Sequence, residues 1–236
     1  MIKTGNAKKY VYLFFIASVI EITSYYFFGE IASLIIKIFP TLSLFFYYYL
    51  SSPFPKKNFD KFLLGSIIFT FFGEIAFSFS HIDLVITFAL FFYLIEHQIY
   101  ISLVRSQRKG EFYFGSKDFF KFGWPYLLFA FLFFGFFLME IVPDSFFFLV
   151  LIYVFQFAIL GVFSILISSE NPGKNFLLWG IALNVISDIL SSFYLFQNGF
   201  NYDYLLIRST FLFSKFLIVS GFIEGRKHVE LKYRKY

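Results

Sequence analysis

The fold of this chain is decided by long apolar stretches, of which residues 176–196 are the clearest: FLLWGIALNVISDILSSFYLF. At a rise of about 1.5 Å per residue, a helix of this length crosses the roughly 30 Å hydrocarbon core of a bilayer. The stretch contains one ionisable side chain, Asp188. Because a charged group inside a membrane is costly, it typically faces other helices and serves a function.

Similar stretches follow one another along the whole chain. Hydrophobic residues make up 59% of its 236 positions and charged residues only 15%, a composition that excludes an ordinary soluble domain. We therefore expect an all-α protein that forms a single integral-membrane domain over residues 1–236, a polytopic bundle of eight transmembrane helices. The predicted spans are residues 10–28, 31–50, 61–79, 84–104, 123–139, 145–167, 176–196 and 204–224.

The distribution of basic residues predicts the orientation of this bundle. With eight spans, 17 of the 20 lysines and arginines lie on the side that carries both termini, and only Arg208 lies on the other side. Basic residues in short loops stay on the cytoplasmic side, so we expect cytoplasmic N- and C-termini in a bacterial cytoplasmic membrane. The basic connection 105–122 could bind RNA or anionic lipid, but beside a span it is better interpreted as a loop that sets topology. We expect no nucleic-acid partner.

Several kinds of chemistry have no support in the sequence. Cysteine is absent, which excludes disulfides and thiolate catalysis. One intramembrane histidine, His97, with scattered carboxylates falls short of a metal-binding set. The glycine-rich phosphate loop and the nucleophile elbow are also missing. We therefore expect neither a metal nor another cofactor.

Ionisable residues recur inside six of the predicted spans, and none lies in the fifth or sixth: Glu21, Lys37, Glu74, Glu96, His97, Asp188 and Lys215. This distribution predicts an interior lined by spans one to four, seven and eight, with spans five and six at the periphery or against lipid. By helical rise, five of these residues lie at similar depth and would form one layer: Glu21, Lys37, Glu74, Asp188 and Lys215.

These charges allow structural and functional interpretations. Pairs such as Glu21 with Lys215, or Asp188 with Lys37, could serve folding alone, and Glu96 could be a neighbour of His97 that points elsewhere. Two carboxyl groups at matching depth can instead divide acid and base roles, which favours Glu74 and Asp188 as catalytic residues. Helical spacing places polar neighbours on the same faces as these charges: Tyr93, His97 and Tyr100 on one span, and Gly180, Asn184, Ser187 and Asp188 on another. Ser and Gly on membrane helices commonly serve close packing, which is the structural interpretation of those residues.

The order and placement of these motifs resemble the YhhN-type lysoplasmalogenases, eight-span proteins that cleave the vinyl ether bond of lysoplasmalogens. The similarity covers most of the chain. Glutamate stands at position 74 where the family has aspartate, and the proline that adjoins the family's lysine is missing after Lys37. Four elements carry the resemblance: Lys37-Ile38-Phe39-Pro40, Gly73-Glu74, His97 with Tyr100, and Gly180, Ala182, Ser187 and Asp188.

The resemblance implies a hydrolase with a lysophospholipid substrate and no organic cofactor. Hydrolysis of a vinyl ether needs a proton donor for the alkene carbon and an ionised group that stabilises the resulting cation. We assign these roles to Glu74 and Asp188 without deciding which is which. The residues expected to bind substrate are Lys37, His97, Tyr100, Asn184 and Ser187, of which Lys37 and His97 would adjust the ionisation of the carboxyl groups or hold the phosphate.

Two other functions remain open from the sequence. A transporter or lipid-binding protein could use the same charges for coupling to protons or solutes. A transporter would be favoured by helices interrupted at matching positions in two inverted halves of the chain. The spans contain Pro40 and Pro125, but no inverted repeat is visible in the sequence. A purely structural membrane subunit predicts that neutralising Asp188 affects folding only. Membrane lipids are expected partners in every case, and the oligomeric state stays open.

Overall fold

The computed structural model describes residues 4–52, 57–107, 117–197 and 199–233. In these ranges the chain is all-helical and contains no strand, which confirms the predicted fold class. Of the expected surface segment 105–122, residues 108–116 lie outside the described residues, whereas residues 117–122 are helical and form the start of α6. The elements are α1 (Thr4–Phe28), α2 (Glu30–Ile36), α3 (Ile38–Ser51), α4 (Asn58–Phe77), α5 (Asp83–Ser106), α6 (Lys117–Phe133), the π-helix η1 (Phe134–Leu138), α7 (Phe147–Ile165), α8 (Lys174–Phe196) and α9 (Asp203–Tyr233).

Seven helices in the described residues are long and apolar enough to cross a membrane, which makes the chain an integral membrane protein. One of the seven is formed by α2 and α3 together, and another by α6 and η1. The remaining predicted span, residues 61–79, corresponds to α4, a helix of 20 residues. Every stretch of 18 residues within α4 contains Asp60, Lys61 and Glu74, so its composition alone does not mark it as a span. The count of eight therefore stays a prediction.

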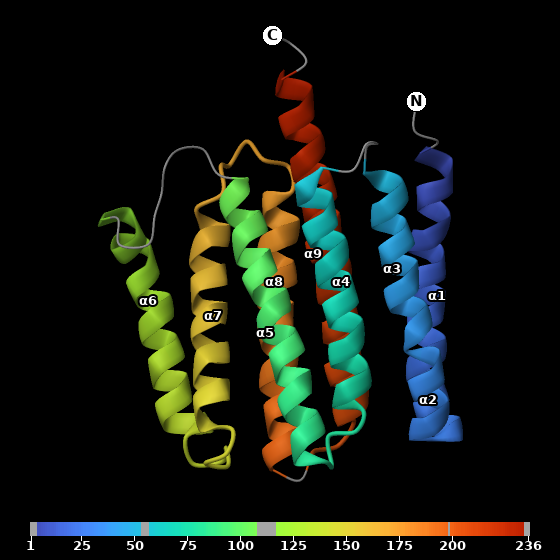
Figure 1. The fold of residues 1–236 in the computed structure, drawn as a ribbon, viewed down its shortest axis with the longest axis vertical. Coiled ribbons are helices and arrows are strands. Elements are labelled where there is room, and N and C mark those ends of the chain that lie inside the picture. Colours follow the sequence, from blue (N-terminus) through green and yellow to red (C-terminus); the bar gives the residue numbers. More distant parts are fainter. Residues whose placement is uncertain (1–3, 53–56, 108–116, 198, 234–236) are drawn as a thin grey trace.

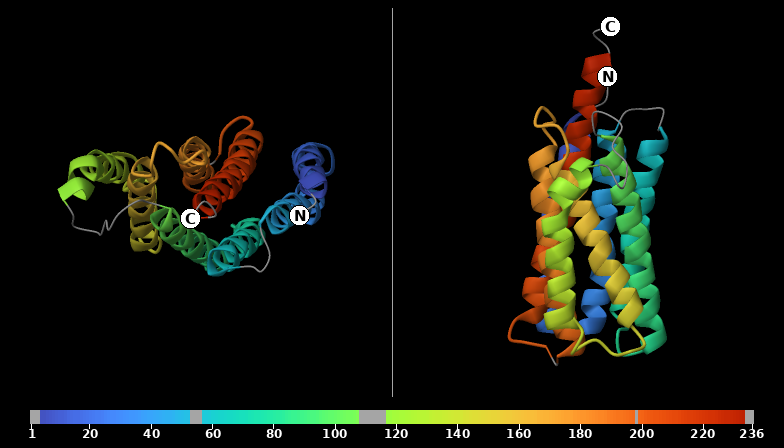
Figure 2. Two further views of the ribbon diagram at one scale, coloured as in Figure 1. Left: turned by 90° about the horizontal axis from the view of Figure 1, so that it is seen from above. Right: turned by 90° about the vertical axis from the view of Figure 1, so that its left-hand side faces the viewer.

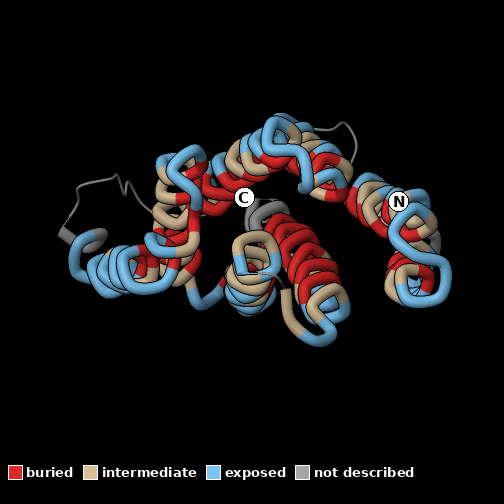
Figure 3. The backbone as a smooth tube through the Cα atoms, turned by 90° about the horizontal axis from the view of Figure 1, so that it is seen from below, coloured by how far each residue is buried: buried red, intermediate tan, exposed pale blue. Residues whose placement is uncertain are grey.

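The helices stand side by side in a curved row with two further helices on its concave face. Seen from above, α6, α7, α5, α4, α3 and α1 form the row, and α8 and α9 pack inside the curve (Figure 2). The closest partners are α8 with α9, α4 with α5, and α1 with α3. Buried residues face the inside of the row and cover most of α9 (Figure 3). The helix that ends the chain is thus the centre of the bundle.

Helices α8 and α9 approach each other closely because glycines face the contact. A Cβ atom added to Gly180 would lie 2.7 Å from the Ile218 side chain and 2.9 Å from its backbone nitrogen. A Cβ atom on Gly173 would lie 2.0 Å from the carbonyl oxygen of Gly221. Small residues allow membrane helices to pack backbone against backbone. Gly180 therefore serves packing, as expected for glycines on these helices.

The two ends of the bundle differ in charge. Helix α1 begins and α9 ends at one end, which we call the basic end because its connections include Lys57, Arg105 and Lys174 (Figure 1). The opposite end, which we call the acidic end, consists of residues 28–30, 78–83, 139–147 and 197–203 without residue 198, which is not described. These four segments contain several carboxylates and neither lysine nor arginine. The predicted orientation, with the basic end cytoplasmic, follows from this distribution of basic residues and stays a prediction.

Candidate active site

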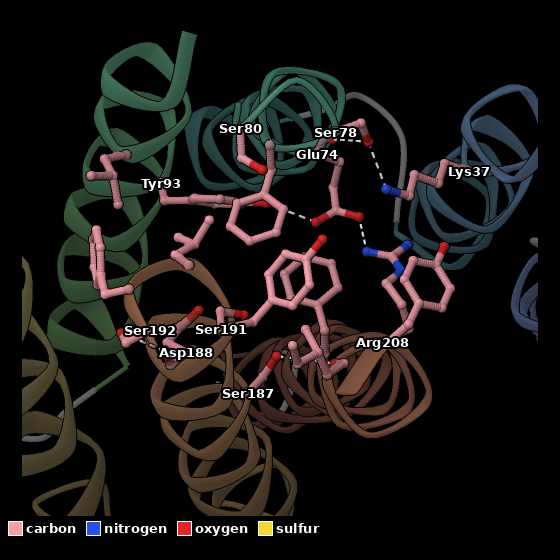
Figure 4. A pocket seen from close by; sticks show the side chains of 18 of the residues that line it. Lys37, Glu74, Ser78, Ser80, Tyr93, Ser187, Asp188, Ser191, Ser192 and Arg208 are labelled. Carbon is pink, nitrogen blue, oxygen red and sulfur yellow. Dashed lines mark hydrogen bonds and ion pairs between the residues drawn. The ribbon is translucent and has the colours of Figure 1, made fainter. Parts of the chain in front are cut away.

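A cavity of about 90 Å³, which we call the polar cavity, lies in the half of the bundle nearer the acidic end. Its walls come from α1, α2, α4, α5, α7, α8 and α9, so elements from both ends of the sequence enclose it. The carboxyl groups of Glu74 and Asp188 both line it, from α4 and α8 (Figure 4). The two predicted acids therefore share one chamber.

Glu74 is held by partners from two other helices. Its Oε2 atom forms an ion pair with the Arg208 guanidinium of α9, and its Oε1 atom accepts a hydrogen bond of 2.7 Å from the Tyr93 hydroxyl of α5. The side chain is buried. A carboxyl group with a cation and a phenol directed at it is stabilised in its ionised form.

Arg208 is predicted to lie on the side of the membrane opposite the termini, but it lies buried inside α9. Its Nε and Nη2 atoms donate to the two oxygens of Glu21 over 2.8 and 3.0 Å, while Nη1 contacts Glu74. Arg208 and Lys215 lie seven residues apart, so two helical turns put them on one face. That spacing was the signal that could have identified Arg208.

Lys37 enters the polar cavity from a break in its helix. Pro40 has no N–H, and its ring conflicts with the carbonyl of the residue four positions earlier, Ile36. The chain is accordingly interrupted between α2 and α3 at Lys37. The Nζ atom donates to the Ser78 hydroxyl over 2.6 Å, and no ion pair joins it to a carboxylate among the described residues. Lys37 thus presents its amino group to the cavity without a carboxylate partner among the described residues.

Asp188 lies in a different environment from Glu74. Its Oδ2 atom accepts a hydrogen bond of 3.0 Å from the Asn184 amide on the preceding helical turn, and Tyr153 of α7 lines the cavity with it. No cationic side chain of the described residues forms an ion pair with it. The Asn184 carbonyl in turn accepts a hydrogen bond from Ser214 over 3.0 Å. Asp188 is therefore oriented by neutral groups.

The other predicted binding residues are distributed unevenly. Ser187 lines the polar cavity, but its hydroxyl donates to the Ile207 carbonyl over 3.1 Å and ties α8 to α9. His97 and Tyr100 are fully buried on α5 and do not line this cavity. The His97 ring packs 4.2 Å from Phe157, and its Nε2 atom lies 3.5 Å from the Asn184 amide.

The predicted single layer of charges is wrong, because the charges form two clusters. One contains Glu21, Glu74 and Arg208, with Lys37 beside it. In the other, nearer the basic end, Lys215 pairs with Glu96 over 2.7 Å and Thr70 donates to the same oxygen over 2.6 Å. The suggested pairs Glu21–Lys215 and Asp188–Lys37 do not form, and Glu96 points into the core. Arg208 and Lys215 are separated by about 10 Å along α9.

A scan of family models matches residues 32–222 to the YhhN family. The matched range begins at the start of α2 and ends in α9, so it includes every helix that lines the polar cavity except α1. No curated protein and no solved structure matches the chain. The match covers well over half of the sequence and confirms the resemblance that the motifs indicate. The chain belongs to the YhhN family.

Proposed function

We propose that this protein is an intramembrane hydrolase that cleaves the vinyl ether bond of a lysoplasmalogen. The observation that carries the proposal is that Glu74 and Asp188 share one cavity but have different partners. Glu74 contacts the Arg208 cation, whereas Asp188 has the neutral Asn184 and Tyr153 beside it. Burial without a cationic partner favours a neutral carboxyl group, so Asp188 is the acid and Glu74 the carboxylate.

The reaction then proceeds in balanced steps. Asp188 delivers its proton to the outer alkene carbon, a C–H bond forms, and the carbon bonded to the ether oxygen becomes an oxocarbenium ion. The ionised Glu74 stabilises this cation and orients a water molecule. The water oxygen bonds to the cationic carbon and its proton returns to Asp188, which yields a hemiacetal. The hydroxyl proton of the hemiacetal is then transferred to the glycerol oxygen, directly or through Asp188, while the bond between that oxygen and the carbon breaks. The products are a fatty aldehyde and the glycerophospho head group with a free hydroxyl.

Lys37 is suited to bind the phosphate of the head group. It lines the cavity and contacts a hydroxyl group in place of a carboxylate, so a bound phosphate would be the anion that stabilises its ammonium form. Arg208 is less available, since three of its nitrogen atoms already contact Glu21 and Glu74. A phosphate beside Lys37 would gain a charge-assisted hydrogen bond.

Aldehyde release by the purified protein tests the proposal. Wild-type protein should produce a fatty aldehyde from a lysoplasmalogen, and Asp188→Asn and Glu74→Gln should each reduce turnover by about 100-fold or more. Asp83→Asn, which changes an exposed carboxylate at the acidic end, is the matched control and should remain active. Undiminished turnover in the Asp188→Asn variant would remove this residue from the mechanism.

A transporter is the second candidate, and the break at Lys37 favours it. Interrupted membrane helices beside a buried charge line the binding sites of many transporters. This function predicts proton-dependent uptake of a lipid or solute into proteoliposomes and no release of aldehyde. Uptake that persists while hydrolysis is absent would replace the hydrolase proposal.

A further inference from the structure

A second cavity lies between α6, α7 and α8, and we call it the apolar groove. Its volume is about 680 Å³, within the roughly 300–1,000 Å³ typical of ligand pockets. Its lining is almost entirely aliphatic and aromatic, with Asp188 as its one ionisable carboxylate. The groove exists because small side chains face it on all three helices: Ala130 on α6, Ala158 and Gly161 on α7, and Ala182 on α8.

The apolar groove is long and runs along the helices. On α7 its lining extends from Val150 to Ile165, which corresponds to about 22 Å of helix. One leaflet of a bilayer contributes roughly 15 Å of hydrocarbon, half of the 30 Å core. The groove is therefore long enough to hold an extended hydrocarbon chain that spans the full thickness of one leaflet.

The apolar groove meets the polar cavity at one place. Val150, Tyr153, Asp188 and Ser192 line both. From this junction the polar cavity extends toward Lys37 and Arg208, and the groove extends along α7 and α8 toward the basic end. A molecule that occupied both the polar cavity and the apolar groove would place its polar part near the acidic end and its apolar part in the groove. The atoms where the two parts join would lie at Asp188.

We propose that the apolar groove binds the hydrocarbon chain of a single-chain ether lysolipid, with the chain's first carbons at Asp188. This inference rests on the proposed function and extends it by assigning the chain to α6, α7 and α8. A lysolipid has the required polarity, because its charged head joins one apolar chain at the ether bond.

The proposal also gives α6 and α7 a role. These helices correspond to the predicted spans without ionisable residues, which the sequence placed at the periphery or against lipid. Their apolar residues form two walls of the groove. A surface that binds a hydrocarbon chain has to be apolar and uncharged, and α6 and α7 provide such a surface to the groove.

Gly161 provides a way to shorten the groove. A Cβ atom at this position would lie 3.6 Å from the Tyr126 ring, an ordinary contact, so a larger side chain extends into the space between α6 and α7. Gly161 lies eight residues from Tyr153 and therefore about 12 Å from the junction. In Gly161→Leu, the ratio of turnover of a long-chain lysoplasmalogen to turnover of a short-chain lysoplasmalogen should fall by at least about tenfold. Gly135→Leu is the matched control, because a Cβ atom added to Gly135 on the outer face of η1 has no atom within 4 Å. This variant should keep the wild-type ratio.

A binding experiment tests the groove independently of hydrolysis. The probe is a non-cleavable alkyl-ether lysolipid with a diazirine at the end of its chain, photolysed with the wild-type protein and with Asp188→Asn in detergent. Labelled peptides should come from α6, α7 and α8, and Gly161→Leu should reduce the labelling. Labelling of these helices without any release of aldehyde would refute the hydrolase and leave the chain site standing.

Three results would overturn the chain site. The first is labelling concentrated on α1 and α3 while aldehyde is released normally. The second is equal labelling of the groove by a two-chain phospholipid, which would make it a general contact with membrane lipid. The third is efficient cross-linking between α6 helices of two copies, which would make the groove a dimer interface.

Discussion

At the scale of residues, the protein is organised by the pairing of buried charges. Arg208 neutralises part of the charge on Glu21 and Glu74, and Lys215 is matched by Glu96. Removing one member of such a pair leaves an uncompensated charge and costs about 3–5 kcal/mol. Lys37 and Asp188 differ from these residues because neither forms an ion pair with a described residue. Groups without an ion-pair partner inside a cavity are the ones available to a ligand.

Lys37→Met should weaken binding of a substrate that carries phosphate. A hydrogen bond to a charged group contributes about 1.5–3 kcal/mol, so the KM for lysoplasmalogen should rise by about tenfold or more. A 1-alkenylglycerol, which lacks the phosphate, should be hydrolysed equally well by both proteins. Lys37→Arg keeps the charge and should restore part of the affinity. An equal loss on both substrates would show that Lys37 supports the fold and does not bind phosphate.

At the scale of elements, two features of the helices position the site. The break between α2 and α3 at Lys37 brings this side chain to the polar cavity, and the contact between α8 and α9 brings Asp188 and Arg208 to the same wall. The second feature depends on glycine, because Gly180 lies against Ile218. Overfilling such a contact typically costs about 1–3 kcal/mol.

Gly180→Ala should therefore reduce the free energy of unfolding by about 1–3 kcal/mol, measured by titration with a denaturing detergent. Gly65→Ala on α4 is the matched control, since no atom lies within 4 Å of the added Cβ. The control should leave stability unchanged or raise it by up to about 1 kcal/mol, because alanine is the better helix former. Equal effects of both substitutions would show that α8 and α9 tolerate a wider separation.

At the scale of the whole molecule, charge distinguishes the two ends of the bundle. The polar cavity lies toward the acidic end, and the apolar groove extends from it toward the basic end. If the basic end is cytoplasmic, a lysolipid of the outer leaflet would enter with its head toward the acidic end and its chain toward the bilayer centre. The orientation therefore determines which leaflet supplies the substrate.

The absence of cysteine makes this orientation directly testable. His81→Cys at the acidic end and Ser169→Cys at the basic end replace exposed residues in connections between helices. In intact cells, a membrane-impermeant maleimide should label His81→Cys and not Ser169→Cys. Both variants should react after the membrane is opened with detergent, which controls for accessibility. Labelling of Ser169→Cys alone in intact cells would reverse the predicted topology.

Part of the site was predictable because helical periodicity reports which residues share a face. Glu74 and Asp188 were recognised as ionisable groups in apolar spans, and both line the polar cavity. Periodicity does not report which faces meet, so the pairing of Glu21 with Arg208 and of Lys215 with Glu96 was missed. Arg208 falls inside the predicted span 204–224, but it lies only about one helical turn from the end of that span. Sequence position alone does not tell whether a side chain at such a place faces the bundle interior or the aqueous side.

The apolar stretches of the chain indicate an all-helical membrane protein, because segments long enough to span a bilayer leave few other folds, and the motifs indicate the YhhN family. The packing of the helices, which these patterns do not report, places Glu74 beside Arg208 and Asp188 beside neutral groups. The same packing makes two spans without charges line an apolar groove that includes Asp188. Partner choice depends on how helix faces pack in three dimensions, a relation between distant segments that local composition does not contain.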